Sequence, residues 1–212
     1  MGQKRKDSNS PQIDKEGSIQ FLLAEFNQCF LHLRHHDNIR VSLTKFSVSF
    51  YSALAVASFA LERYFYYQLG VKSIDLYLGV ALAFAFAVGI IIILMLARTR
   101  KYFIAIVRQL GAVREVFMRG IKDAGIDFES HLPVGAARAK PLNLKSNYLL
   151  TLYLICLMNS IPILFSVVLF LRYFSFNLTS LWWVAALVAA LSLFVELLVV
   201  IRIIGGKKWE LR

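Results

Sequence analysis

The pattern of apolar and polar positions predicts four membrane-spanning helices. Residues 76–97 carry no charged side chain, and an apolar stretch of that length crosses the ~30 Å hydrocarbon layer of a bilayer as a helix. A basic cluster of Arg98, Arg100 and Lys101 follows directly and is typical of a cytoplasmic membrane interface. The other three apolar stretches are residues 46–66, 148–171 and 181–201. We therefore expect an all-α, polytopic membrane protein.

Apolar residues continue at helical spacing outside the first two predicted spans. Upstream of residue 46 they predict a helix that begins near Gly17, with Ser18 as its N-cap. No glycine or proline separates this helix from the first span, so one rod from about residue 18 to 66 is expected. Both extensions are expected to pack as a cytoplasmic stalk; the alternative is that they lie flat as amphipathic anchors. The apolar positions are Ile19, Leu22, Leu23, Phe26, Phe30 and Leu33 upstream, and Phe103, Ile106, Val107, Leu110, Val113, Phe117 and Ile121 downstream.

These patterns divide the chain into six segments. The predicted segments are a disordered basic tail (1–17), a cytoplasmic helix (18–45), the first two spans (46–97), a cytoplasmic helix and loop (98–146), the last two spans (147–204) and a cytoplasmic tail (205–212).

The distribution of basic residues predicts the orientation. Of the 24 lysines and arginines, only Arg63, Lys72 and Arg172 fall in the two short connections on the opposite side from the termini. Because basic residues concentrate on the cytoplasmic side, both termini are expected in the cytoplasm.

Composition and charge leave two interpretations of the cytoplasmic face. The formal net charge is +11, while 58% of the residues are hydrophobic. Anionic lipids of the inner leaflet account for such a charge; the alternative is that the face binds a nucleotide or oligonucleotide. The candidate residues for an anionic ligand are Arg34, Arg40, Arg108 and Arg114.

Several polar residues interrupt the predicted spans. Glu196 is the strongest candidate, because a carboxylate inside a span usually faces protein or water and lines a pathway or pairs with another helix. Asn159, Ser160 and Ser52 are further candidates for a pore wall or for helix contacts. Pro162 removes a backbone hydrogen bond and is a candidate hinge, with plain packing as the alternative.

The sequence favours no catalytic, metal or cofactor site. His32 and His36 are four residues apart, but no cysteine or carboxylate is arranged beside them as a further metal ligand. No serine, histidine and aspartate set and no zinc-protease motif is present in the sequence. We therefore expect neither an enzyme nor a bound cofactor.

Two stretches carry a resemblance to a known family. Residues 33–40 (LRHHDNIR) run into a serine-containing span, and residues 98–103 (RTRKYF) lead into residues 108–114 (RQLGAVR). This arrangement resembles SLATT-type bacterial membrane effectors, and the channel component of Hailong-type defence is similar in broad plan. The resemblance covers roughly residues 20–121 and implies a pore in a nucleotide-signalled anti-phage system.

Taken together, these features predict a homo-oligomeric inner-membrane pore or ion-channel-like effector that a cytoplasmic anionic ligand gates. The alternative is a non-conducting anchor or scaffold that recruits a soluble signalling partner through the same helices. A small transporter is less favoured, because no inverted repeat is detectable in the sequence.

Overall fold

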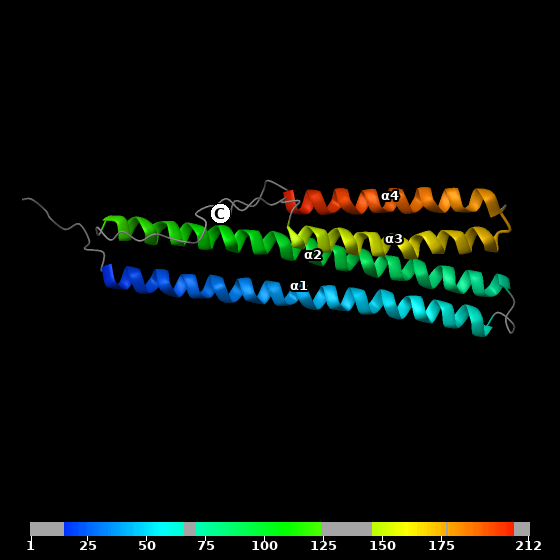
Figure 1. The fold of residues 1–212 in the computed structure, drawn as a ribbon, viewed down its shortest axis with the longest axis horizontal. Helices are drawn as coiled ribbons and strands as arrows, with labels where there is room; N and C mark the ends of the chain where they lie inside the picture. Colours follow the sequence, from blue (N-terminus) through cyan, green and yellow to red (C-terminus); the bar gives the residue numbers. More distant parts are fainter. Residues whose placement is uncertain (1–14, 66–70, 124–145, 177, 206–212) are drawn as a thin grey trace, which may run out of the picture. The chain divides into compact units, whose positions relative to one another are not determined.

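The computed structural model describes residues 15–65, 71–123, 146–176 and 178–205, and these residues form four helices and no strand. Two long helices, α1 (Lys15–Phe65) and α2 (Val71–Asp123), precede two shorter ones, α3 (Asn147–Tyr173) and α4 (Leu178–Gly205) (Figure 1). Each helix contains a stretch that is long and apolar enough to cross a membrane. The predicted all-α fold with four long apolar helices is therefore confirmed.

The first helix is continuous, as expected from the absence of glycine and proline after residue 17. It begins at Lys15, so Ser18 lies inside the helix and the predicted N-cap is wrong. Lys15, Glu16 and Gly17 are helical and do not belong to a disordered tail. The remainder of that tail (1–14), residues 124–145 of the predicted loop and residues 206–212 lie outside the described residues.

The chain divides into two compact units, and the first contains the early part of α1 and the late part of α2. In this unit the side-chain amide of Gln109 on α2 donates a hydrogen bond to Oε1 of Glu25 on α1. Cys29, one turn after Glu25, is buried at 5% exposure. Ile19, Leu23 and Phe30, which the pattern placed on the packed stripe, are more than half exposed; the inward face carries Leu22, Phe26, Cys29 and Leu33.

The second unit contains residues 35–65 of α1, residues 71–105 of α2, α3 and α4. Its larger hydrophobic core forms where the end of the apolar stretch of α2 meets the beginning of α3 and the end of α4. The members of this core are Ile92, Ile93, Leu96, Ala97, Ile104, Leu149, Leu152, Ile155, Cys156, Val200 and Ile204. A smaller core of Val168, Leu181 and Ala185 closes the opposite end of the α3–α4 pair.

A tight turn ends α3, which packs against α4. The amide of Phe176 donates to the carbonyl of Leu171 at 3.1 Å, and the amide of Ser175 donates to that of Arg172 at 3.0 Å. This is the Schellman pattern of helix termination, in which the residue after the cap adopts a left-handed conformation. Ser175 occupies that position with φ of 61°, where glycine is more usual.

Candidate functional site

Three helices of the second unit meet in a buried chain of polar side chains. Oη of Tyr51 on α1 donates to Oδ1 of Asn159 on α3 at 2.8 Å. Nδ2 of Asn159 donates in turn to Oε1 of Glu196 on α4 at 2.7 Å. Asn159 is fully buried, and Tyr51 and Glu196 are 7% and 6% exposed. We call Tyr51, Asn159 and Glu196 the polar junction.

The helix α2 approaches the polar junction at a glycine. A Cβ atom added at Gly89 of α2 would overlap Oδ1 of Asn159 and Oη of Tyr51. Only a residue without a side chain allows α2 to approach the junction this closely. All four helices therefore converge on Asn159.

The polar junction is not fully satisfied. Oε2 of Glu196 is buried beside Oγ of Ser192, one turn earlier on α4, and neither atom bonds to another helix among the described residues. Buried polar atoms are nearly always paired, so each exception calls for an explanation such as a role in function. Here two such atoms lie next to each other on α4, at the end of the hydrogen-bonded chain.

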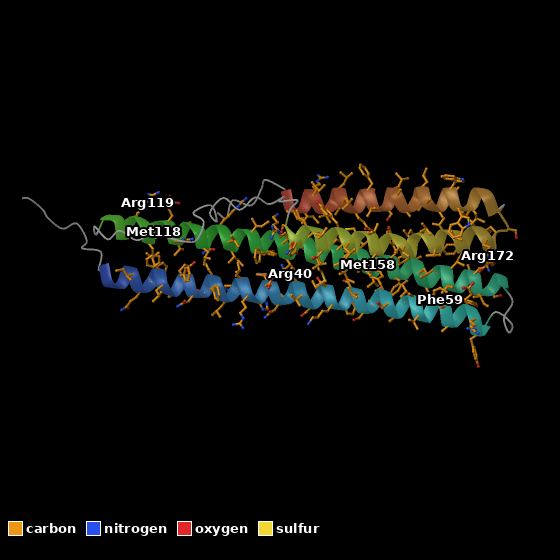
Figure 2. All side chains as sticks on the ribbon, viewed as in Figure 1. Arg40, Phe59, Met118, Arg119, Met158 and Arg172 are labelled. Atoms are coloured by element: carbon orange, nitrogen blue, oxygen red, sulfur yellow. The ribbon has the colours of Figure 1, made fainter. Side chains whose placement is uncertain are left out.

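A cavity of about 580 Å³ that is partly open at the surface extends from the polar junction along α1 and α3. Its lining is mostly apolar and includes Phe59, Met158 and Trp182; Figure 2 labels the first two, together with Arg172. Its polar lining residues are Tyr51, Ser52, Ser58, Glu62 and Arg172. Tyr51 belongs to both features, so the cavity meets the junction at this side chain.

An ion pair joins the beginning of α2 to the end of α3. Nε of Arg172 lies 2.8 Å from Oδ2 of Asp75, whose carboxylate is buried. Two turns earlier on α3, Oγ of Ser166 donates to the carbonyl of Gly79 at 2.8 Å. These contacts tie α3 to α2 beside the cavity.

The structure brings the polar residues predicted within the spans to the same part of the second unit. Asn159 and Glu196 bond to each other, and Ser52 and Pro162 line the cavity. Ser160 instead donates to the carbonyl of Leu157 in its own helix, at 2.7 Å. The helix α3 continues through Pro162 without a break.

The four arginines proposed as a ligand-binding face are divided between the units. Arg34, Arg108 and Arg114 belong to the first unit and Arg40 to the second. Arg40 forms an ion pair with Asp37 at 2.7 Å, within α1. The structure therefore does not define these four residues as one site.

The thiol of Cys29 is placed unfavourably for chemistry. Burial raises its pKa, and the carboxylate of Glu25, whose Oε1 lies 4.0 Å from Sγ, raises it further. Since the thiolate is the reactive form, this environment keeps the side chain inert.

Two members of the site were not found from the sequence. Tyr51 is one of many aromatic residues in its span, and nothing in the spacing distinguishes it. Gly89 carried a signal, because it is an isolated glycine inside an otherwise bulky apolar run, which often marks a close approach of backbone and neighbour.

No protein-family model matches the chain, and neither a curated protein nor a solved structure matches it. The function is therefore argued from the polar junction and the cavity.

Proposed function

We propose that the chain is a multi-pass protein of the inner membrane whose four helices cross the bilayer with both termini in the cytoplasm. Four apolar helices of sufficient length support the crossing, and the concentration of lysine and arginine around the termini and the long α2–α3 connection supports the orientation. The end of α2 and the beginning of α1 then extend into the cytoplasm.

We further propose that this bundle conducts cations. The observation that carries the proposal is the double role of Tyr51, which lines the cavity and also joins the hydrogen-bonded chain to Asn159 and Glu196. Ionisable residues within membrane helices are costly and commonly mark ion or proton pathways. A carboxylate at the end of such a route favours cations over anions.

The polar lining follows the length of the cavity. From Glu62 to Tyr51 the eleven-residue separation corresponds to about 17 Å along α1, which is more than half of the ~30 Å hydrocarbon layer. Ser58 and Ser52 lie between them on the cavity wall. In the described conformation the packed side chains of the polar junction close the route, so conduction requires Asn159 and Glu196 to separate.

Gating by a cytoplasmic anionic ligand and assembly into an oligomer complete the proposal. The net charge of +11 supports an anionic ligand, and the resemblance of residues 20–121 to SLATT-type effectors suggests a nucleotide signal in anti-phage defence. Exposed apolar side chains along α1, such as Val56 and Phe59 at 70% and 78% exposure, support contact with lipid or with a second copy.

Ion flux from liposomes that contain the purified full-length protein tests conduction. We expect flux that added cyclic nucleotides or short oligonucleotides switch on or off, and a changed flux in Glu196→Gln. Ser49→Ala, an exposed serine of α1 outside the cavity lining, is the matched control and should conduct as the native protein does. Absence of flux in every condition, with insertion verified, would overturn the proposal.

Charge reversal at Arg108 and Arg114 tests gating separately from conduction. Both residues lie on the part of α2 that belongs to the first unit. If the anionic ligand acts there, these variants retain the open flux but lose the response to nucleotide. An unchanged response would exclude both residues from ligand sensing.

A non-conducting anchor or scaffold is the second candidate function. The apolar side chains that the first unit leaves uncovered, among them Phe21 at 68% and Leu31 at 66% exposure, would suit a soluble partner as well as a second copy. Patches of this kind often bind other proteins. A monomer in detergent that gives no flux but binds a soluble partner through residues 15–34 would support the anchor over the pore.

A further inference from the structure

A second cluster of charged and aromatic side chains lies in the second unit, outside the polar junction. Tyr148, in the first turn of α3, is 5% exposed, and its hydroxyl donates to the carbonyl of Leu96 on α2. Cζ of Arg100 lies 5.0 Å from the centre of the tyrosine ring, and Cζ of Arg40 lies 5.6 Å from it. Guanidinium groups from α1 and α2 therefore contact the same aromatic ring.

The positive charge of this cluster is only partly compensated. Arg40 pairs with Asp37, but no carboxylate among the described residues forms an ion pair with Arg100. Nε of Arg100 is buried and has no hydrogen-bond partner in the described ranges. Cation–π contacts with the same Tyr148 ring make the two like charges neighbours, and an anion that contacts both guanidinium groups would relieve their repulsion.

The beginning of α3 adds further positive potential at the same place. Ser146, at the N-cap position, makes no side-chain capping hydrogen bond within the described structure, and the first turn contains no acidic residue. The first amide groups of a helix have no partners inside the helix and attract anions. This helix end supports the arginine pair and does not define the site alone.

The cluster also lies at the depth where phosphate groups occur. Arg100 is three residues beyond the apolar stretch 76–97, about 4.5 Å along the helix. In the proposed topology this is the cytoplasmic headgroup region. Guanidinium groups bind phosphate with charge-assisted, often bidentate hydrogen bonds.

We infer that Arg40 and Arg100, held by Tyr148, form a binding site for a phosphate group. The phosphate comes either from an anionic phospholipid of the cytoplasmic leaflet or from a soluble nucleotide. The inference rests on the proposed membrane topology and names a site for the anionic ligand. Because Tyr148 also contacts the backbone of Leu96, a phosphate bound at this site couples α1, α2 and α3 at the end of the bundle.

Ligand retention by the full-length protein in neutral detergent tests the site without any measurement of flux. Native mass spectrometry compares phosphatidylglycerol with diacylglycerol, which lacks the phosphate, and thermal unfolding with added ATP or pyrophosphate tests the soluble source. The double variant Arg40→Gln/Arg100→Gln is expected to bind at least about tenfold more weakly, as loss of hydrogen bonds to a charged group implies. Arg98→Gln is the matched control, since Arg98 is exposed and two residues away.

Each outcome separates the sources or overturns the site. The ligand is a lipid headgroup if the double variant loses phosphatidylglycerol and ATP or pyrophosphate has no effect on the native protein. It is a soluble phosphate if ATP or pyrophosphate stabilises the native protein and the double variant loses this stabilisation. The inference is overturned if phosphatidylglycerol and diacylglycerol are retained equally and neither ATP nor pyrophosphate stabilises the protein. It is also overturned if Arg98→Gln weakens ligand binding as much as the double variant does. If the double variant does not fold, Arg100→Lys keeps the charge without Nε and is expected to weaken binding. Intact binding without flux would refute the pore and leave this site standing.

Discussion

Asn159 and Glu196 lie on different helices, and the side-chain amide of Asn159 donates a 2.7 Å hydrogen bond to the carboxylate of Glu196. Apart from Tyr51 and Ser192, the nearby core is apolar and includes Ile155 and Cys156 on α3 and Val200 on α4. In the proposed membrane topology apolar packing gives little orientation to neighbouring helices, because lipid tails are as apolar as the side chains. We therefore expect the bond between these two residues to help specify how α3 and α4 face each other.

Replacement of Asn159 by leucine tests this role. The variant removes the partner of Tyr51 and the partner of Glu196 Oε1, and leaving buried polar groups unpaired costs about 1–3 kcal/mol. We expect a lower free energy of unfolding in mixed detergent micelles, measured by circular dichroism. Ser160→Ala is the control, because its hydroxyl bonds only within α3; equal stability of both variants would contradict the assignment.

Gly89→Ala is expected to disrupt the polar junction from the side of α2. The new Cβ would overlap side-chain atoms of Asn159 and Tyr51, and forcing extra volume into a packed interior typically costs about 1–3 kcal/mol. Gly79→Ala provides the matched control on the same helix, since its Cβ would make an ordinary 3.6 Å contact with Leu169. Thermal unfolding of the two variants side by side measures the difference. Equal midpoints would show that α2 does not approach the junction closely.

The sequence predicted the helices well because their signals are local. Residues 76–97 form a long run without charge, and no glycine or proline occurs near residue 45. Each of these signals depends only on residues within a few helical turns. Glu196 and Asn159 were also identifiable, since a polar residue in an apolar run is conspicuous. Phe30, which belongs to the predicted stripe, is exposed in the single chain, because many positions before residue 46 are apolar and the packing partner decides which face is buried.

The side-chain partners were beyond sequence reasoning. Tyr51 and Asn159 are 108 residues apart, and no periodicity relates them. Likewise, Arg100 belonged to a basic cluster that the predicted topology alone would explain, and its position over Tyr148 depends on where α3 begins. Such contacts follow from the packing of helices, which the pattern of a single chain does not specify.

The ion pair between Asp75 and Arg172 is expected to stabilise the contact between α2 and α3. Arg172→Gln leaves the buried carboxylate of Asp75 without its partner. We expect a loss of about 2 kcal/mol, less than the 3–5 kcal/mol typical of breaking a fully buried pair, because the arginine is partly exposed. The double variant Asp75→Asn/Arg172→Gln should recover part of this loss, whereas Arg63→Gln, an exposed arginine of α1, should change little. Additive losses in this double-mutant cycle would show that the pair is not coupled.

The uncovered apolar side chains of the first unit are expected to mediate self-association. Phe21 and Leu31 on α1 are 68% and 66% exposed, and burial of each such side chain contributes about 1.5–3 kcal/mol. Phe21→Ser/Leu31→Ser should therefore reduce the oligomeric mass measured by size-exclusion chromatography with light scattering, at unchanged helical content. Gln28→Ser, also exposed on this segment of α1, controls for the substitution itself. An unchanged mass in the double variant would place the subunit contacts elsewhere, and a monomeric native protein would favour the anchor over the pore.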